Sequence, residues 1–588
     1  MTSQHAQPAV LGVERSERGR KWVPRAEDAA VTALQQQAGL DRIQASLLAG
    51  RHVTPEKAAG FLEPMLKADL PDPSSMAGMD QAVSTILDAM EARKTIVLFS
   101  DYDVDGGTSA AQMIRWGRGL GFDFGLHVPD RIRDGYGPSR QAFEKLKADG
   151  AELVVTLDCG AAAHDALHGA AEIDLPVVVI DHHLMDGLPP AEAIVNPNRP
   201  DDQSGLGHLA AAGVTFLLIV ALNRAAKQRG MTPALDIREL LGLAAFGTVC
   251  DVVPMVGLNR TIVKQGLKVM DRQRIAGLNA LSAIANIAPP FSSYHLGFVL
   301  GPRINAGGRI GKSEMGAQLL STDDESKAHS HAIELDRLNR ERRGLQDDMV
   351  RAAIEQAERQ DNRAVIIVAM EGWHPGIIGI VAGRLKDRFE RPAIVIGIDE
   401  EGVGKGSGRS IKGVDLGTRF TEALKAGLLE AGGGHAMAGG LTIWKDRIAA
   451  FSDWIESQLS AEVAEASQSP VSKVDGVLSP AAVNLSLVDA IEKVGPYGPQ
   501  NPSPVFIVAD VRVSFAKRLQ GGHVRFTAQD RGGASVSGIL FQGDETSLGQ
   551  TLLDAGERHL HLLGQVKRNS WQGRDSADFQ LKDLAWAD

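Results

Sequence analysis

Carboxylates and histidines come directly after three short apolar segments of this chain. The segments and the polar residues that follow them are 95–100 with Asp101, Asp103 and Asp105, 153–157 with Asp158, and 176–180 with Asp181, His182 and His183. Apolar runs of this length are typical of buried strands, and parallel strands gather their functional groups at their carboxyl ends. Carboxylates suit hard divalent ions such as Mg²⁺ or Mn²⁺, and imidazole favours the transition metal. The pattern therefore predicts a metal site suited to phosphoester hydrolysis.

Each of the three motifs also has a simpler interpretation. The aspartates at 101, 103 and 105 could form a solvated acidic turn, although carboxylates this close repel one another unless a cation neutralises them. Asp158 could cap the next helix, and the two histidines could be ordinary core or surface residues. Because a buried aspartate is costly unless it is paired or bound to metal, the three motifs together favour metal binding.

A fourth carboxylate and both cysteines lie beside these candidates. Asp251 follows an apolar helical segment, so we expect it either to join the metal site or to end that helix. Cys159 and Cys250 are the neighbours of Asp158 and Asp251. Soft sulfur suits Mn²⁺ or Mg²⁺ poorly, so we expect packed thiols and not ligands.

Glycine-rich segments elsewhere carry cations and hydroxyl groups. Residues 301–309 are expected to form a tight loop with two arginines, and two further glycine-rich loops are expected over 402–408 and 432–440. Glycine lets a ligand approach the backbone closely. Ser407 and Arg409 add a hydroxyl group and a guanidinium, which binds phosphate through two parallel hydrogen bonds. These segments predict phosphate binding.

Composition limits the class of protein. The chain has 588 residues, which suggests three or four domains at roughly 100–200 residues each. Apolar residues make up 44% and charged residues 23%, as in soluble globular proteins. The net charge is −11, from 62 Lys and Arg against 73 Asp and Glu. That balance argues against a protein that coats nucleic acid, but it allows an enzyme with a local basic channel.

Targeting and redox features predict a cytoplasmic protein with no membrane association. The N-terminus is polar and lacks the apolar core of a signal peptide. The longest apolar runs, such as 214–222, fall short of the roughly 18 residues that would suggest a membrane span. Only two cysteines occur, so we expect no disulfide framework.

The chain divides into six regions by pattern. They are a disordered tail over 1–27, a helical segment over 28–75, a doubly wound parallel α/β domain over 76–320, a long connecting helix over 321–361, a second α/β domain over 362–460 and a C-terminal all-β domain over 473–588. The α/β assignments rest on apolar runs that alternate with helical stretches. The charged segment 328–361 contains no proline and predicts a helix of roughly 50 Å between two domains, with an apolar repeat too irregular for a coiled coil. The size of the last region suggests an OB-type barrel, although alternation alone does not select one.

The motifs, in this order, resemble those of the DHH phosphoesterase superfamily and, within it, the bacterial RecJ family of single-strand-specific 5′→3′ exonucleases. The resemblance covers almost everything from about residue 28 onward and rests on residues 101–106, 158–160, 181–183, 250–254, 301–306, 372–382, 407–410, 432–435 and 496–502. It implies a DHH domain, a DHHA1 domain and an OB domain. It also implies hydrolysis of single-stranded DNA from the 5′ end to 5′-mononucleotides, in recombination and repair, with two Mn²⁺ or Mg²⁺ ions as cofactors.

The resemblance implies one catalytic set and one departure from the family pattern. The set is Asp103 at the first metal, Asp105 at the second, Asp158 bridging both, His182 and Asp251 completing the second site, and His183 beside the substrate. Many family members have His-Gly where this chain has Phe99-Ser100. Phe99 cannot ligate a metal, so we expect the first ion to be held more weakly or Asp101 to contribute.

The resemblance also implies how the strand is bound. The substrate-binding set is Arg131, Arg303, Asn305, Arg309, His374, Ser407, Arg409 and His435. The 5′ end would lie against Ser407, Arg409 and one of Arg303 and Arg309, in a groove too narrow for a duplex. The β domain would grip the strand through basic and aromatic groups, with Lys517, Arg518, His523, Arg525 and Phe526 as candidates. Single-stranded-DNA-binding protein and a helicase are the implied protein partners, and we expect a monomer.

Three rival functions share parts of this pattern. A small-substrate DHH phosphatase or oligoribonuclease would have the same metal site, and so would an inorganic pyrophosphatase of the superfamily. Neither needs a C-terminal β domain or the long helix. A non-catalytic replication scaffold would be expected to lose metal ligands, whereas the core motifs are intact here.

Overall fold

The chain folds into two compact units, each built from separate stretches of sequence. This computed structural model describes residues 7–131, 133–272, 275–467, 470–571 and 574–587. Within the described residues, the first unit, called the α/β unit below, consists of 70–253 and 257–467, and the second, called the barrel unit, consists of 7–69, 254–256 and 470–587. Each unit is described by itself.

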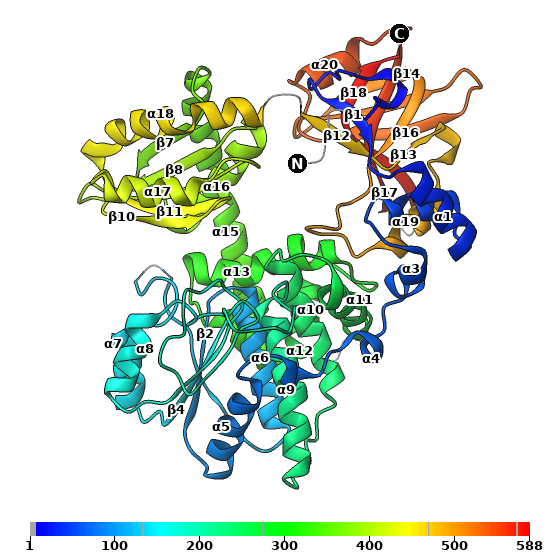
Figure 1. Cartoon of the computed structure of the whole chain (residues 1–588). Helices are drawn as coiled ribbons and strands as arrows, with labels where there is room; N and C mark the ends of the chain where they lie inside the picture. The colour runs from blue at the N-terminus through cyan, green and yellow to red at the C-terminus, as the bar shows by residue number, and fades with distance from the viewer. Residues whose placement is uncertain (1–6, 132, 273–274, 468–469, 572–573, 588) are drawn as a thin grey trace. The chain divides into compact units, whose positions relative to one another are not determined.

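A parallel sheet of five strands forms the centre of the first half of the α/β unit (Figure 1). Its order is β3 (Gly125–His127), β2 (Ile96–Ser100), β4 (Leu153–Leu157), β5 (Val177–Ile180) and β6 (Ala193–Val195). Every residue of β4 and β5 is buried. Strands covered on both faces need no polar alternation, which is why the sequence shows continuous apolar runs there. The predicted doubly wound parallel sheet is confirmed.

Helices cover both faces of this sheet (Figure 1). One face carries α7 (Arg140–Ala148) and α8 (His164–Glu172), and the other carries α5 (Met79–Glu91), α6 (Val104–Arg118) and α9 (Ala211–Gln228). The chain leaves β2 through α6 on one face and leaves β4 through α8 on the opposite face. The carboxyl ends of β2 and β4 therefore flank a topological switch point, where open α/β sheets bind ligands.

A group of shorter helices completes the first half of this unit. They are α10 (Leu241–Cys250), α11 (Gly257–Met270), α12 (Ala276–Ile284), the π-helical turn η5 (His295–Leu300), α13 (Gly301–Ile310) and α14 (Met315–Ser321). The prediction of a tight loop over 301–309 is wrong, because these residues are α13. Leu300 and Ile304, one helical turn apart, are buried, and the glycines serve close packing: a Cβ on Gly308 would come within 3.1 Å of the Tyr102 carbonyl oxygen.

The long helix α15 (Glu325–Ala357) links the two halves of the α/β unit. Its 33 residues give about 50 Å at 1.5 Å per residue, as predicted. Asp324 caps its start by accepting hydrogen bonds from the backbone N–H groups of Ser326 and Lys327. Met349 and the residues that follow on the same side are buried under the second sheet.

The second half is a mixed sheet with helices on both faces. Its order is β10 (Ala431–His435), β11 (Ala438–Trp444), β9 (Val403–Arg409), β8 (Ala393–Ile398) and β7 (Ile366–Glu371), with α16 (Pro375–Phe389) on one face and α17 (Leu416–Lys425) and α18 (Ile448–Ala466) on the other. Only β7 and β8 are parallel. The helix α16 connects the two parallel strands and packs over β8 and the antiparallel β9, while α15 packs against β7.

The prediction that the glycine-rich segments 402–408 and 432–440 are loops is wrong. They form β9 and the hairpin of β10 and β11. The physical reason is packing: a Cβ on Gly408 would lie 2.7 Å from the Phe420 ring, and one on Gly406 would lie 2.5 Å from Leu441. The glycines of β9 face the core and let bulky side chains reach the strand.

The C-terminal region is a closed barrel of the OB type. The ring runs β14 (Phe506–Leu519), β15 (His523–Gln529), β16 (Ser535–Leu540), β18 (Arg574–Trp586) and β17 (His559–Trp571), and β17 pairs back with β14. Two helices, α19 (Leu485–Val494) and α20 (Ser547–Asp554), pack against it. The predicted OB-like all-β domain is confirmed.

The N-terminal part of the described chain belongs to this barrel unit. The prediction of a disordered tail over 1–27 is wrong for residues 7–27, while residues 1–6 lie outside the described residues. The strand β1 (Lys21–Pro24) pairs in parallel with β12 (Val471–Val474), and the Trp22 side chain is fully buried against Ile507 and Leu563. This segment is ordered by pairing with a strand some 450 residues away in the chain, which local composition does not reveal.

Helices α1 (Asp28–Ala38), α2 (Arg42–Ala49) and α3 (Pro55–Leu62) share the barrel's core through residues such as Leu34, Leu47 and Leu48. Asp583, which is 2% exposed, anchors the segment before them. It accepts hydrogen bonds from the Ser16 hydroxyl at 2.5 Å, the Trp22 indole N–H at 3.3 Å and the Arg18 backbone N–H at 3.2 Å.

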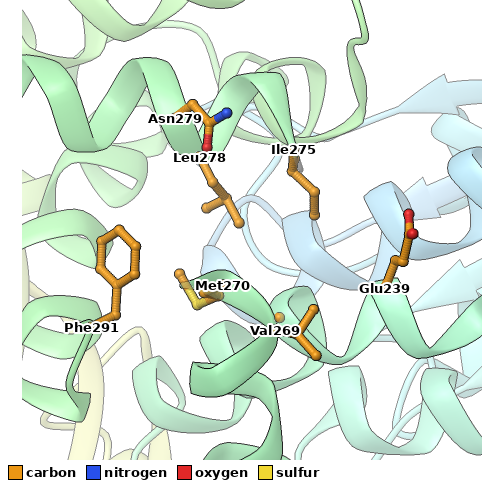
Figure 2. Close-up of a pocket in the computed structure, with 8 residues that line it drawn as sticks. Glu239, Val269, Met270, Ile275, Leu278, Asn279 and Phe291 are labelled. Carbon is orange, nitrogen blue, oxygen red and sulfur yellow. The ribbon is translucent and has the colours of Figure 1, made fainter. Parts of the chain in front are cut away.

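A small apolar cavity of about 20 Å³ lies among the helices of the α/β unit (Figure 2). Met270, Leu278 and Phe291 are among its lining residues. It holds about one water-sized sphere and offers that water few polar partners, so it is a packing defect and not a ligand site.

Asp583→Ala should destabilise the barrel unit, because it leaves the buried Ser16 hydroxyl and Trp22 N–H without an acceptor. We expect a loss of about 2 kcal/mol, or roughly 4–8 °C in the melting temperature of a unit this size. Differential scanning calorimetry measures the shift. Asp554→Ala, at the exposed end of α20, is the matched control, and equal melting temperatures for the two variants would contradict the anchoring role.

Candidate active site

The first acidic motif lies at the turn from β2 into α6. Asp103 is the N-cap of α6 and accepts hydrogen bonds from the backbone N–H groups of Asp105 at 2.8 Å and Gly106 at 3.3 Å. The side chain of Asn305 in α13 accepts one from the Val104 N–H at 3.1 Å. A Cβ on Gly106 would lie 2.5 Å from the Asp101 carbonyl oxygen, so this tight turn requires glycine.

The carboxylate of Asp105 is held by the N-terminus of α9. Its two oxygens accept hydrogen bonds from the backbone N–H groups of Ala211 at 2.7 Å and Ala212 at 2.8 Å. The positive end of the helix dipole favours a carboxylate there. A Cβ on Gly247 of α10 would come within 2.6 Å of Asp105 Oδ1, so α10 can pack here only with glycine at that position.

Four strand or helix ends bring carboxylates and imidazole together. His182 Nε2 lies 3.4 Å from Asp158 Oδ1, 3.4 Å from Asp251 Oδ2 and 3.9 Å from Asp105 Oδ2. Asp158 follows β4, and Asp251 is the C-cap of α10. The structure thus joins residues that are up to 146 positions apart (251 − 105).

A second group of carboxylates meets beside the first. Ligand atoms of Asp101, Asp103 and Asp158 all lie within 4.8 Å of one another, and Asp158 also forms such a group with the two histidines. Phe99 points away, into the apolar core, where its ring lies 6.1 Å from that of Phe143. The aspartate that follows β2 therefore stands where it can supply the ligand that Phe99 cannot.

His183 is oriented by two residues that sequence reasoning did not single out for this role. Its Nδ1 lies 2.8 Å from Asp181 Oδ1, and the Tyr136 hydroxyl lies 3.1 Å from the same nitrogen. Asp181 also accepts hydrogen bonds from the backbone N–H groups of Ala161, His182 and His183. Asp181 is therefore a structural acceptor that fixes the His-His turn. In the sequence, Asp181 cannot be told apart from the candidate metal ligands, because it too follows directly after an apolar strand.

The electrostatics of the cluster favour a bound cation. Burial, followed by repulsion from Asp103, raises the pKa of Asp105 to about 7. Burial, followed by repulsion from Asp105, raises the pKa of Asp251 to about 9 and also raises that of Asp158. Burial lowers the pKa of His182 to about 4, so this imidazole is neutral and can act as a ligand. Buried carboxylates repel one another here, and a positive ion would relieve that repulsion.

Burial is the largest single influence on the pKa of His183 and lowers it, but the hydrogen bond to Asp181 and the attraction of Asp181, Asp101 and Asp105 together raise that pKa above its usual value. Burial by itself would raise the pKa of Asp181, but the hydrogen bond to His183, the attraction of both histidines and the hydrogen bond from the Ala161 N–H together hold that pKa below its usual value. The two histidines therefore differ in character: His182 is set up as a neutral ligand and His183 as a hydrogen-bond donor.

The ligand atoms of the cluster also fit divalent ions because several of them make no hydrogen bond. In the described part of the chain, four buried atoms of the cluster have no hydrogen-bond partner: Asp101 Oδ1, Asp158 Oδ1, His182 Nε2 and Asp251 Oδ2. Buried polar atoms are almost always satisfied. Carboxylate oxygens with one imidazole nitrogen form the ligand set that Mn²⁺ and Mg²⁺ accept. Burial raises the pKa of Cys159 and of Cys250, so both thiols stay protonated.

A cavity of about 970 Å³ opens between the two halves of the α/β unit. Arg131, Arg309, His374, Ser407 and Arg409 line it. This brings together five of the eight residues predicted to bind substrate, from segments up to 278 positions apart (409 − 131).

Three arginines meet in this cavity without an ion-pair partner among the described residues. Burial, followed by repulsion from Arg131, lowers the pKa of Arg309 to about 10 and also lowers that of Arg409. Arg131 rests on the Tyr102 ring, 5.0 Å from its centroid. Arginine side chains keep their charge at neutral pH, so the cavity attracts an anion.

The other predicted substrate residues lie elsewhere. Arg303 is paired with Asp336 of α15 at 2.9 Å, and Asn305 holds the start of α6. Neither these two nor His435 is among the described residues that line the cavity. His435 is exposed at the end of β10. It pairs with Ala438 of β11, which in turn pairs with Arg409 of β9.

The candidates on the barrel separate into surface and core. Lys517 and Arg525 are exposed and face each other across β14 and β15, and Arg518 is exposed beside them. Phe526 was a candidate for strand contact, but it is fully buried in the barrel core, because it lies on the inward side of the alternation in β15. The His523 ring packs edge-on against the ring of Phe541. Phe541 is exposed and is an aromatic candidate for strand contact that the sequence analysis did not name.

Known families and proteins match this chain over most of its length. The RecJ OB domain matches residues 474–583, the N-terminal domain of the DHH family matches 95–248, and the DHHA1 domain matches 362–461. The single-stranded-DNA-specific exonuclease RecJ of Bacillus subtilis is 33% identical over 572 residues, which are 96% of this chain and 71% of that protein. The chain belongs to the RecJ family.

Other RecJ proteins agree with this assignment. RecJ of Escherichia coli is 34% identical over 90% of this chain and 93% of its own length. The crystal structure of RecJ from Thermus thermophilus in complex with Mn²⁺ superposes with a TM-score of 0.78 at 28% identity, covering 95% of this chain and 78% of that one. None of the helices in the described parts of this RecJ-family chain has the length and apolar character needed to cross a bilayer.

Asp251→Asn should stabilise the metal-free protein, and more so as the pH rises. The folded state holds a proton on Asp251 up to about pH 9, whereas the unfolded chain loses it near pH 4. Stability therefore falls as the pH rises between these values, and the amide removes this penalty. Melting temperatures in EDTA from pH 5 to pH 8 measure the growing difference between variant and wild type.

Added Mn²⁺ provides the control for this comparison. It should raise the melting temperature of the wild type by more than that of Asp251→Asn, because at one ion concentration the protein that binds the ion more tightly gains more stability. A difference between the two proteins that stays constant with pH would contradict the role of Asp251 in the charged cluster.

Proposed function

We propose that this chain hydrolyses single-stranded DNA from its 5′ end and releases 5′-mononucleotides, with two Mn²⁺ or Mg²⁺ ions in the cluster around Asp158. One observation carries the proposal: four buried ligand atoms that have no hydrogen-bond partner among the described residues meet at the carboxyl edge of the first sheet, in the same unit as a cavity lined by three arginines. The first arrangement suits cations and the second suits phosphate. Both occur in a chain whose relatives are named single-stranded-DNA-specific exonucleases.

The ligand groups would divide between two ions. Asp101, Asp103 and Asp158 would hold one ion, and Asp105, His182 and Asp251 the other, with Asp158 near enough to His182 to serve both. When bound, such ions act as Lewis acids at phosphoryl oxygens and lower the pKa of water. The helix N-terminus at Asp105 keeps that carboxylate fixed and favours its ionised form.

His183 is the residue that contacts the scissile phosphate in this proposal. Asp181 holds its Nδ1, so the ring cannot turn away and stays a hydrogen-bond donor. A fixed donor aimed at a phosphoryl oxygen stabilises the charge that develops there in the transition state.

The arginine-lined cavity explains the polarity of cleavage. Arg309, Ser407 and Arg409 would bind the 5′-phosphate, and the next phosphodiester would then lie over the metal cluster. A guanidinium matches phosphate geometry with two parallel N–H groups. The enzyme would then release one nucleotide at a time, because a bound 5′-phosphate places only the first phosphodiester bond of the strand at the metal cluster.

Partners and compartment are inferred from the family and the composition. We propose single-stranded DNA as substrate, single-stranded-DNA-binding protein and a helicase as protein partners in recombination and repair, and a monomer as the active form. Both cysteines are unpaired thiols, in keeping with a reducing cytoplasm.

A time course on end-labelled oligonucleotides tests the activity and its direction. With Mn²⁺ or Mg²⁺, a 5′ label should leave at once as mononucleotide, a 3′-labelled strand should shorten gradually, and blunt duplex should survive. Asp158→Asn, which keeps the size of the side chain, should lower kcat by about a thousandfold or more, because it removes the ligand shared by both ions. Cleavage confined to oligomers of two to four nucleotides would favour a small-substrate phosphoesterase instead.

Arg409→Ala tests the basis of polarity. It should remove most of the preference for a 5′-phosphate over a 5′-hydroxyl strand, with a loss of roughly 10–100-fold in kcat/KM for the phosphorylated strand. The matched control is Arg384→Ala, an exposed arginine on α16 outside the residues that line the cavity. A variant that loses activity equally on both strands would contradict the phosphate role.

A further inference from the structure

The cavity offers more anion-binding groups than a single 5′-phosphate needs. In β9 the glycines at 404, 406 and 408 are buried against the core, while Lys405, Ser407 and Arg409 alternate with them on the opposite face. All three line the cavity. Residues two apart on a strand are roughly 6.6 Å apart, so the three side chains form a row along one face.

The two ends of the row differ. At one end the Arg409 guanidinium lies 3.0 Å from the Ser407 hydroxyl oxygen, so these two groups can bind one phosphate together. Lys405 is the opposite end. Its ammonium lies 3.1 Å from the Thr442 hydroxyl on the neighbouring strand, and among the described residues it forms no ion pair with a carboxylate.

The sheet beside this row is open. Gly440 pairs with Ser407, and Gly433 pairs with Gly440 in the next strand. A Cβ on Gly433 would meet nothing within 4 Å, and one on Gly440 would meet only the Gly406 carbonyl oxygen at 3.9 Å. These glycines, unlike those that face the core, leave a floor without side chains on which a ligand can lie.

The charge of the lining favours more than one phosphate. Arg131, Arg309, Lys405 and Arg409 are its cations, and Asp399 is the one acidic residue among those described. One oxygen of Asp399 accepts a hydrogen bond from the Val403 backbone N–H at 2.7 Å. Four cations against one carboxylate, in a chain of net charge −11, mark a local site for a highly charged anion.

We propose that this cavity accepts 5′-triphosphate ends, with the α-phosphate at Ser407 and Arg409 and the outer phosphates along the glycine floor at Lys405. The inference rests on the proposed function and extends its substrate class to polyphosphorylated 5′ ends. Lys405 is the residue that determines this specificity.

The chemistry is the same hydrolysis applied to a longer end. Water adds to the phosphorus between the first and second nucleotides, the bond from that phosphorus to the 3′ oxygen of the first nucleotide breaks, and the 3′ oxygen takes a proton. The first product is then a nucleoside 5′-triphosphate. The remaining strand carries a 5′-monophosphate and enters later rounds as an ordinary substrate.

The test compares strands of one sequence with 5′-hydroxyl, 5′-monophosphate and 5′-triphosphate ends. Mass spectrometry should identify a nucleoside triphosphate as the first product of the third strand. Lys405→Ala should lower the ratio of kcat/KM for the triphosphate strand to that for the monophosphate strand about tenfold or more. Gly440→Val fills the floor without changing charge and should shift the ratio in the same direction. Lys425→Ala, on the exposed side of α17, is the control and should leave the ratio unchanged.

Binding without turnover separates this inference from the proposed function. In EDTA, fluorescence anisotropy should show tighter binding of the triphosphate strand than of the monophosphate strand, and Lys405→Ala should remove the difference. No cleavage of any strand, with this binding preference kept, would overturn the proposed function alone. Degradation of the monophosphate strand with survival of the triphosphate strand, or release of pyrophosphate before any nucleotide, would overturn the inference.

Discussion

Mutual repulsion among buried carboxylates is the constraint on which the rest of this structure depends. Asp105 and Asp158 are almost completely buried and close to one another and to Asp251. Such a group is stable only if positive charge is supplied from outside the chain or if protons are taken up. The fold meets part of this need, because the backbone N–H groups at the N-terminus of α9 support Asp105. The raised pKa values of Asp105, Asp158 and Asp251 show that the carboxylates take up protons where no ion neutralises them.

The same logic, with the sign reversed, describes the neighbouring cavity. Arg309 and Arg409 are largely buried beside Arg131, and burial followed by repulsion lowers their pKa values. A cluster that needs cations and a cluster that needs anions therefore lie in one unit. A nucleic acid strand with divalent ions satisfies both, because its phosphates bind the arginines and the ions bind the carboxylates.

Glycine has two opposite uses in the second sheet, and only the structure tells them apart. The glycines of β9 face inward and let Phe420 and Leu441 pack against the strand. Gly433 and Gly440 face the cavity and leave its floor open. In the sequence both sets resemble flexible loops, which is why the pattern predicts loops where β9, β10 and β11 form. The pairing register decides the matter, because it fixes which side of the sheet each residue faces.

The sequence by itself determined the doubly wound sheet, the long helix, the OB-type barrel and the metal-ligand candidates. These features depend on local patterns: apolar runs ending in Asp101, Asp158 or His182, and the charged, proline-free α15. Tertiary structure alone decided that Arg303 pairs with Asp336, that Phe526 is a core residue, that Tyr136 and Asp181 orient His183, and that the strand containing Trp22 completes the barrel unit. The physical reason is distance along the chain. A strand-end carboxylate is recognised from its neighbours in sequence, whereas an ion pair, a core position or a strand pairing depends on partners that are far away in sequence.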